Sequence, residues 1–198
     1  MRISFRKNFG RALFVMGALT LACWGYLLLE QIWAQRAADR LLKEQILEAN
    51  RASQRHTTAL NQTQIRPRRG DIIGRLEIPR IRLSVIVLEG SDSRILRDGA
   101  GHLQGTALPG MMGNVGIAAH RDTFFRPLRD VRGSDIVLLT TSRGVFQYRV
   151  EGIEIVDPND VRVLQKTKDA ELTLVTCYPF YYIGPAPKRF IVRARQQG

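Results

Sequence analysis

VFQYRVEGIEIV, residues 145–156, alternates apolar and polar side chains along most of its length. Such period-two alternation, rich in Val, Ile, Phe and Tyr, is typical of a β-strand that buries one face. Six other stretches are similarly enriched in β-branched or aromatic residues: IIGRLEI (72–78), RLSVIVL (82–88), NVGIAAH (114–120), DIVLLTT (135–141), ELTLVTC (171–177) and RFIVRAR (189–195). The second part of the chain is therefore predicted to be mostly β.

Turn-forming sequences such as Pro109-Gly110 and Asp157-Pro158-Asn159 separate these predicted strands. About seven or eight short strands, with no long helical pattern between them, favour a closed barrel or a sandwich. ILRDGAGHL (95–103) is the best candidate for a short helix. We expect a single domain over residues 71–198, because a chain of 198 residues is too short for two full domains.

The net charge of +12 is concentrated in the first third of the chain. Residues 1–70 hold 12 basic and 4 acidic side chains, whereas residues 71–198 hold 18 and 14. The β domain is thus only mildly basic, which does not favour a nucleic-acid-binding protein. The two cysteines of the chain exclude a disulfide-stabilised scaffold.

Residues 12–29 (ALFVMGALTLACWGYLLL) contain no charged side chain. As a helix they would span about 27 Å, close to the hydrocarbon core of a bilayer at about 30 Å. Basic residues precede this segment, so the positive-inside rule predicts a cytoplasmic N-terminus and an extracytoplasmic β domain. We predict an uncleaved, single-pass anchor in the cytoplasmic membrane. A cleaved signal peptide and a buried helix of a soluble protein are the alternatives.

Residues 30–70 connect the predicted anchor to the β domain. Apolar residues recur at helical spacing between 31 and 50, which predicts a juxtamembrane helix. The periodicity is lost over 51–70, which ends in RPRRG and is expected to be a linker. The chain is thus divided into a basic N-terminus (1–11), a membrane anchor (12–29), a juxtamembrane helix and linker (30–70) and the β domain (71–198).

Three residue types in the β domain are candidates for nucleophilic catalysis. Cys177 ends a predicted strand, where a rigid scaffold can present a nucleophile at a rim, although a lone cysteine is more often a buried small hydrophobe. A reactive thiolate needs a neighbouring imidazole or other cation, and either His120, at another strand end, or His102, in a predicted glycine-rich turn, could supply it. Arg189 could stabilise an oxyanion or orient a carbonyl, although an arginine in such a position is more often a solvated strand end.

The sequence offers little for a metal or a nucleotide. It contains no CxxC or HExxH motif and no phosphate-binding glycine motif. The acidic residues between 151 and 160 lack the spacing of a calcium-binding loop. We therefore predict no metal site and no cofactor, and leave any calcium dependence open.

Several motifs, in order, resemble those of the sortase family. TLVTCYPF (173–180) resembles the sortase signature TLxTC, and GNVGIAAHRDTFFRPL (113–128) is similar to the histidine strand and the loop after it. The same family resemblance extends to RLEIPRIRLSVIVLEG (75–90), GTALPG (105–110) and KRFIV (188–192). TCYPFYYIGPAPKRFIV (176–192) is most similar to class D sortases and shares features with class C pilin polymerases.

The resemblance implies a closed eight-stranded sortase-type β-barrel with short helices, preceded by an N-terminal transmembrane helix. It also implies a cysteine transpeptidase that acts on exported proteins ending in an LPxTG-like sorting signal. Cys177 would form a thioester with the substrate, and His120 would donate and accept the protons. Arg189 would hydrogen-bond the substrate or the oxyanion, with a contribution from the backbone near Thr176. The acceptor would be an amine of peptidoglycan or of a pilin.

Two other functions remain open. One is that of an exported cysteine enzyme similar to L,D-transpeptidases, whose usual motif carries His and Gly before the nucleophile where this chain has Val175-Thr176. The other is that of a catalytically inactive, sortase-like binding module. We expect membrane lipid as a partner through the N-terminal helix, and no nucleic acid.

Overall fold

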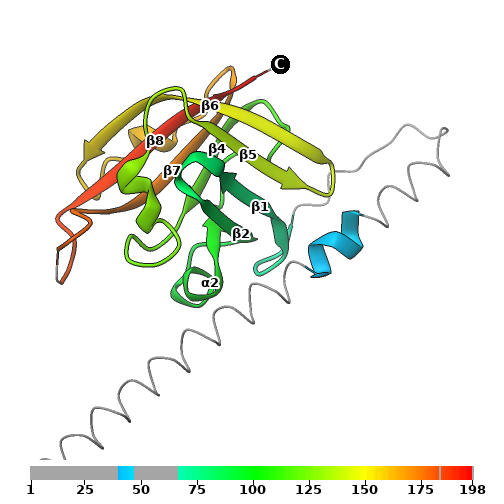
Figure 1. The fold of residues 1–198 in the computed structure, drawn as a ribbon, viewed down its shortest axis with the longest axis horizontal. Helices are drawn as coiled ribbons and strands as arrows, with labels where there is room; N and C mark the ends of the chain where they lie inside the picture. Colours follow the sequence, from blue (N-terminus) through cyan, green and yellow to red (C-terminus); the bar gives the residue numbers. More distant parts are fainter. Residues whose placement is uncertain (1–39, 47–66, 183, 198) are drawn as a thin grey trace, which may run out of the picture. The chain divides into compact units, whose positions relative to one another are not determined.

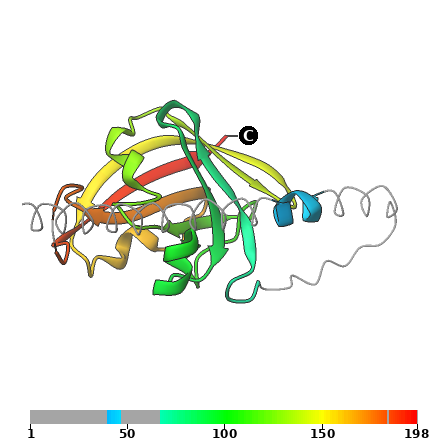
Figure 2. The same ribbon diagram turned by 60° about the horizontal axis from the view of Figure 1, so that its bottom comes forward.

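The computed structural model describes residues 40–46, 67–182 and 184–197. Within the last two ranges, eight strands close into a barrel in the order β1-β2-β3-β4-β7-β8-β6-β5 (Figures 1 and 2). The predicted mostly β, closed eight-stranded barrel is thereby confirmed. The strands are β1 (Ile72–Ile78), β2 (Leu83–Glu89), β3 (Ala100–His102), β4 (Gly113–Ala118), β5 (Ile136–Thr141), β6 (Gly144–Val156), β7 (Ala170–Tyr178) and β8 (Lys188–Gln196).

Short helices occupy the connections of the barrel. Helix α2 (Ser93–Asp98) lies between β2 and β3, and 3-10 turns are formed by η1 (Pro79–Ile81), η2 (Arg126–Asp130) and η3 (Val161–Leu164). Residues 40–46 form a further short helix. The predicted anchor at 12–29 lies outside the described residues, among which no helix is both long and apolar enough to span a bilayer.

Alternating side chains fill the interior of the barrel. Val115 and Ile117 of β4, with Leu172 and Leu174 of β7, are at most 1% exposed and belong to one core cluster. Burying one such side chain completely contributes about 1.5–3 kcal/mol. Because successive side chains on a strand point to opposite faces, the residues between these positions face the outside of the barrel.

The structure corrects the second half of the helix predicted over 95–103. Helix α2 begins after Asp92, whose carboxylate accepts hydrogen bonds from the backbone amides of residues 94 and 95, and it ends at Gly99. Strand β3 follows directly and pairs in parallel with β2. Its backbone packs so closely that a Cβ atom on Gly101 would lie 2.2 Å from the carbonyl oxygen of Gly90.

We therefore expect Gly101→Ala to lower the free energy of unfolding by about 1–3 kcal/mol, because a backbone oxygen cannot move aside as a flexible side chain can. Chemical unfolding of both proteins measures this difference. Gly133→Ala is the matched control, since a Cβ there would meet no atom within 4 Å. Equal stability of the two variants would contradict this account of β3.

A second close contact, between Arg80 and Asp135, ties the β1–β2 connection to the start of β5. Arg80 donates through Nε and also through Nη2, at 2.6 Å, and the backbone amide of Arg132 donates at 2.8 Å. The hydrogen bonds from the Arg80 side chain hold the pKa of Asp135 below its usual value. Its ionised form therefore stabilises the fold above the ordinary aspartate pKa, near 3.9, and this contribution disappears as the pH falls through the lowered pKa.

Asp135→Asn should accordingly reduce stability at pH 7 and flatten the loss of stability as the pH falls below about 4. Thermal melts of wild type and variant across that range measure the effect. A pH dependence as steep in Asp135→Asn as in wild type would show that other carboxyl groups control acid unfolding.

Candidate active site

The predicted nucleophile and the predicted arginine lie opposite each other on neighbouring strands. In the antiparallel β7–β8 ladder, Cys177 is the Cα partner of Arg189. Residues directly opposite in such a ladder share one face, with Cβ atoms about 4.5–5.5 Å apart. Both side chains are partly exposed, and Cys177 is a free thiol. The register therefore brings a thiol and a guanidinium together on the outer face of the barrel.

His120 approaches the same face from β4. This strand runs parallel to β7 with Ala118 as the Cα partner of Val175, and the amide of Ala119 extends the pairing by donating to the Val175 carbonyl at 3.2 Å. Since side chains alternate, His120 shares a face with Ala118 just as Cys177 does with Val175. The exposed His120 side chain is thus placed at the end of β4 next to the end of β7.

Buried contacts hold the backbone at these strand ends. The Thr176 hydroxyl donates to the Ala119 carbonyl at 2.7 Å, and Thr176 is only 2% exposed. After His120 the chain turns back, so that the amide of the fully buried Phe125 donates to the His120 carbonyl at 3.0 Å. Of the predicted substrate-binding residues, Thr176 has its side chain committed to the fold, which leaves its backbone as the group that could meet a substrate.

The other candidate histidine lies in the core instead. His102 belongs to β3, not to a turn, and is 2% exposed. Its Nδ1 lies 2.6 Å from Oε2 of the buried Glu89, and its Nε2 lies 2.9 Å from the carbonyl oxygen of Ala107 and 3.1 Å from the Thr106 hydroxyl. With both ring nitrogens occupied, His102 is a structural histidine, and His120 is the imidazole that the geometry leaves for Cys177.

The Arg189 side chain hydrogen-bonds to backbone carbonyls near the start of β8. Its Nη1 lies 3.3 Å from the carbonyl oxygen of Ala186 and 3.1 Å from that of Lys188, immediately before and at the start of β8. A guanidinium has five N–H donors in a planar fork, so the remaining donors can serve a ligand. These contacts fix the orientation of the side chain from which a carbonyl or oxyanion could accept.

A cluster of apolar side chains lies beside the candidate site on the outer face of β7 and β8. Ile191 and Val175, which face outward on β8 and β7, pack with Val163 and Leu164 of η3. Two buried polar residues fasten the η3 segment: Nδ2 of Asn114 donates to the Val163 carbonyl at 3.0 Å, and the Thr173 hydroxyl donates to Oδ1 of Asn114 at 2.8 Å. These polar anchors escaped the sequence analysis, because neither residue forms a motif and their contacts join positions about 50–60 residues apart.

A cavity of about 440 Å³ lies between η3 and the β3–β4 connection, lined in part by Leu103, Thr106, Val161 and Leu164. Side chains of three of these residues surround Gly116, where an added Cβ would meet each at 3.1 Å. The outward positions of β4, two residues apart, lead from Gly116 towards His120. The cavity therefore continues the face that carries the candidate site.

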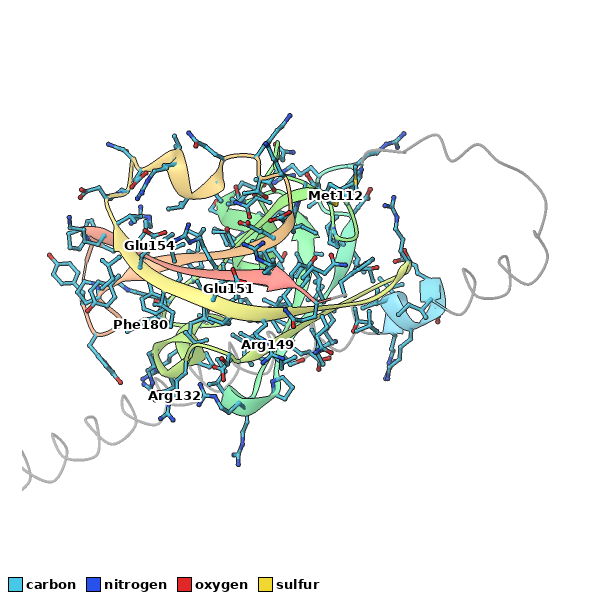
Figure 3. All side chains as sticks on the ribbon, turned by 90° about the horizontal axis from the view of Figure 1, so that it is seen from above. Met112, Arg132, Arg149, Glu151, Glu154 and Phe180 are labelled. Atoms are coloured by element: carbon cyan, nitrogen blue, oxygen red, sulfur yellow. The ribbon has the colours of Figure 1, made fainter. Side chains whose placement is uncertain are left out.

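A second cavity, of about 540 Å³, lies on the other side of the β3–β4 connection, towards the start of β4. Glu89, His102 and Met112 are among its lining residues, near the start of β4. Figure 3 shows Met112 well separated from Phe180, which follows Cys177 by three positions. The cavity and the candidate catalytic residues therefore lie at different ends of β4. We place the site at the end where Cys177 lies, because only that end of β4 and β7 carries a thiol. Among the described residues no group of three or more His, Cys, Asp or Glu side chains is placed to hold a metal ion.

Comparison with known proteins assigns the family. The model of the sortase domain matches residues 76–197. The chain belongs to the sortase family. Sortase D of Bacillus subtilis (strain 168) is 34% identical over 192 residues, which covers 93% of this chain and 96% of that protein. The resemblance noted from TLVTCYPF and the other motifs is confirmed.

Solved sortase structures have the same barrel. A Clostridium perfringens sortase D5 transpeptidase aligns with a TM-score of 0.68 at 26% identity, covering 83% of this chain and 99% of that one. Sortase C1 of GBS pilus island 1 aligns with a TM-score of 0.67 at 26% identity, covering 83% and 92%. The sortase assignment makes this chain a member of a transpeptidase family and does not favour the alternative of an L,D-transpeptidase.

Proposed function

We propose that this sortase is a cysteine transpeptidase that cleaves an LPxTG-like sorting signal and transfers the new acyl group to an amine. One observation carries the proposal: Cys177 and Arg189 are paired across β7 and β8, while His120 follows by two residues the end of β4, the strand that pairs with β7. Acyl transfer from an amide requires a nucleophile, a proton donor for the leaving amine and a donor for the oxyanion, and this face holds one residue suited to each.

The reaction proceeds in two acyl transfers. The Cys177 thiolate attacks the carbonyl carbon of the Thr–Gly-type bond, and the oxyanion accepts hydrogen bonds from Arg189. When the C–N bond breaks, the imidazolium of His120 gives its proton to the leaving amine, and a thioester remains on the sulfur. An incoming amine then attacks the thioester, passes a proton to His120 and expels the thiolate, which restores the enzyme.

The substrates and acceptors follow from the location we propose. With the segment at 12–29 as an uncleaved anchor, the barrel stands on the extracytoplasmic face of the membrane, where exported proteins with a C-terminal sorting signal arrive. The acceptor amine belongs to peptidoglycan or to a pilin. Without such an amine, water takes its place and the protein acts as a slow protease.

Mass spectrometry of the full-length chain tests the chemistry. Wild type and Cys177→Ala are incubated with a panel of LPxTG-like peptides, with and without a small amine such as triglycine. We expect an acyl adduct on wild type that disappears upon addition of the amine and yields a transpeptidation product, and neither species with Cys177→Ala. A folded wild-type protein that forms no adduct with any peptide would favour the inactive binding module.

A further inference from the structure

The loop between β7 and β8, residues 179–187, joins the two strands that carry Cys177 and Arg189. It is also tied to the segment that follows His120. Two arginines of that segment, Arg121 and Arg129, each engage a tyrosine of the loop. Figure 1 shows the loop in orange and red, at the same end of the barrel as η2. These contacts therefore link the segment that follows His120 to the loop that joins the strands of Cys177 and Arg189.

Arg121 makes the closer of the two contacts. Its Nη2 donates to the carbonyl oxygen of Tyr182 at 2.6 Å and to that of Gly184 at 3.1 Å. Its guanidinium carbon also lies 5.8 Å from the centroid of the Tyr182 ring, within cation–π range. A single side chain therefore holds the loop backbone at two points and covers a ring. Lysine would keep a charged donor for the carbonyls, but it lacks the planar guanidinium that lies over the ring.

Arg129 provides a second, outer contact. Its Nη1 donates to the Tyr181 hydroxyl at 2.7 Å, and its guanidinium carbon lies 5.7 Å from the centroid of that ring. Tyr181 itself is 75% exposed, so little else holds it. This contact is the weaker of the two, because its partners remain in solvent, where ionic and polar contacts are screened.

We propose that Arg121, assisted by Arg129, is a positioning residue that clamps the β7–β8 loop to the histidine segment. The clamp itself is independent of the proposed function, and only its expected effect on catalysis rests on that function. Arg121 directly follows His120, and the loop directly precedes β8, so the clamp limits the movement of His120 relative to Arg189 and Cys177. A displacement of about 1 Å between reacting groups can cost about 100-fold in rate, which gives the clamp a kinetic consequence.

The first test needs no substrate. The full-length chain is treated with limiting chymotrypsin, and cleavage after Tyr181 and Tyr182 is followed by mass spectrometry. Hydrogen bonds from a charged group are stronger than neutral ones, so loss of the clamp should increase the population of the open loop about tenfold. We expect Arg121→Met to accelerate cleavage in the loop by that factor, Arg121→Lys to give an intermediate rate, and Tyr181→Phe, which keeps a cleavage site, to give a smaller increase.

Arg126→Met is the matched control. Arg126 lies on the same segment and is exposed, and within the part of the chain that the structure describes its side chain makes no hydrogen bond or ion pair. It should leave loop cleavage unchanged. Equal cleavage of wild type and Arg121→Met would overturn the clamp. The cleavage assay does not require turnover. If wild type forms no acyl adduct with any peptide, that result contradicts the proposed function but not the clamp.

The second test asks whether the clamp positions the catalytic groups. With a peptide that wild type cleaves, Arg121→Met should lower kcat by about 10–100-fold and change KM by less than about threefold. Arg121→Lys should recover part of kcat, and Arg126→Met should match wild type. A merely structural contact would shift the melting temperature without this split between kcat and KM. A faster-cleaved loop with unchanged kcat would overturn the positioning role.

Discussion

His120→Gln is expected to lower kcat for peptide acyl transfer by about 10²–10⁴-fold, the range attributed to a positioned general acid and base. Glutamine has a comparable size and can still form hydrogen bonds, but it cannot give a proton to the leaving amine or take one from the incoming amine. The His120 side chain is exposed at the end of β4, so the melting temperature should stay within about 2 °C of wild type.

Steady-state assays with a labelled peptide and an amine acceptor measure this loss. Asp122→Asn, an exposed neighbour on the same segment, is the control and should retain wild-type activity. If His120→Gln kept more than about a tenth of wild-type kcat, another group would have to supply the proton, and the assignment of His120 would be wrong.

His102→Leu should have the opposite profile, with a large loss of stability. The substitution leaves Glu89, which is 6% exposed, without its ring partner and removes the donor to the Ala107 carbonyl. Leaving a buried hydrogen-bonding group without its partner typically costs about 1–3 kcal/mol, and more when that group is charged. Urea unfolding of the full-length chain at pH 7, followed by far-UV circular dichroism, measures the difference.

A double variant separates this penalty from the loss of packing. Replacing a buried pair by apolar residues is often close to neutral, so Glu89→Leu combined with His102→Leu should be more stable than His102→Leu alone. A double variant less stable than either single variant would contradict the account of Glu89 and His102 as a mutually dependent pair. In the folded fraction of His102→Leu, alkylation of Cys177 should proceed as in wild type, because the side-chain contacts of His102, to Glu89, Thr106 and Ala107, include no residue of the site.

The contrast between the two histidines shows where sequence reasoning reaches its limit. Seven strands could be predicted to within one or two residues because period-two alternation is a local property of the chain. Strand β3 was not predicted, since Ala100, Gly101 and His102 have low strand propensity and are held by pairing with β2 and β4. Whether His102 or His120 faces Cys177 depends on that pairing, which no local pattern reveals.

Some residues at the candidate site could be identified from the sequence, and others could not. Cys177, His120 and Arg189 could be singled out because they are chemically distinctive and stand in motifs at strand ends. The arginines at 121 and 129 could not, since the β domain is rich in arginine and their tyrosine partners lie 52 to 61 residues further along the chain. Contacts of this kind arise from tertiary structure, and a sequence without a motif does not predict them.

Closure of the barrel has a consequence for solubility. Strand β5 (Ile136–Thr141, IVLLTT) has no charge, proline or glycine, the composition of segments that stack into amyloid. In the native protein it pairs with β1 on one side and β6 on the other, so neither of its edges can recruit a strand from another molecule. Variants such as His102→Leu would expose this segment whenever the barrel opens, and their aggregation should therefore begin at β5.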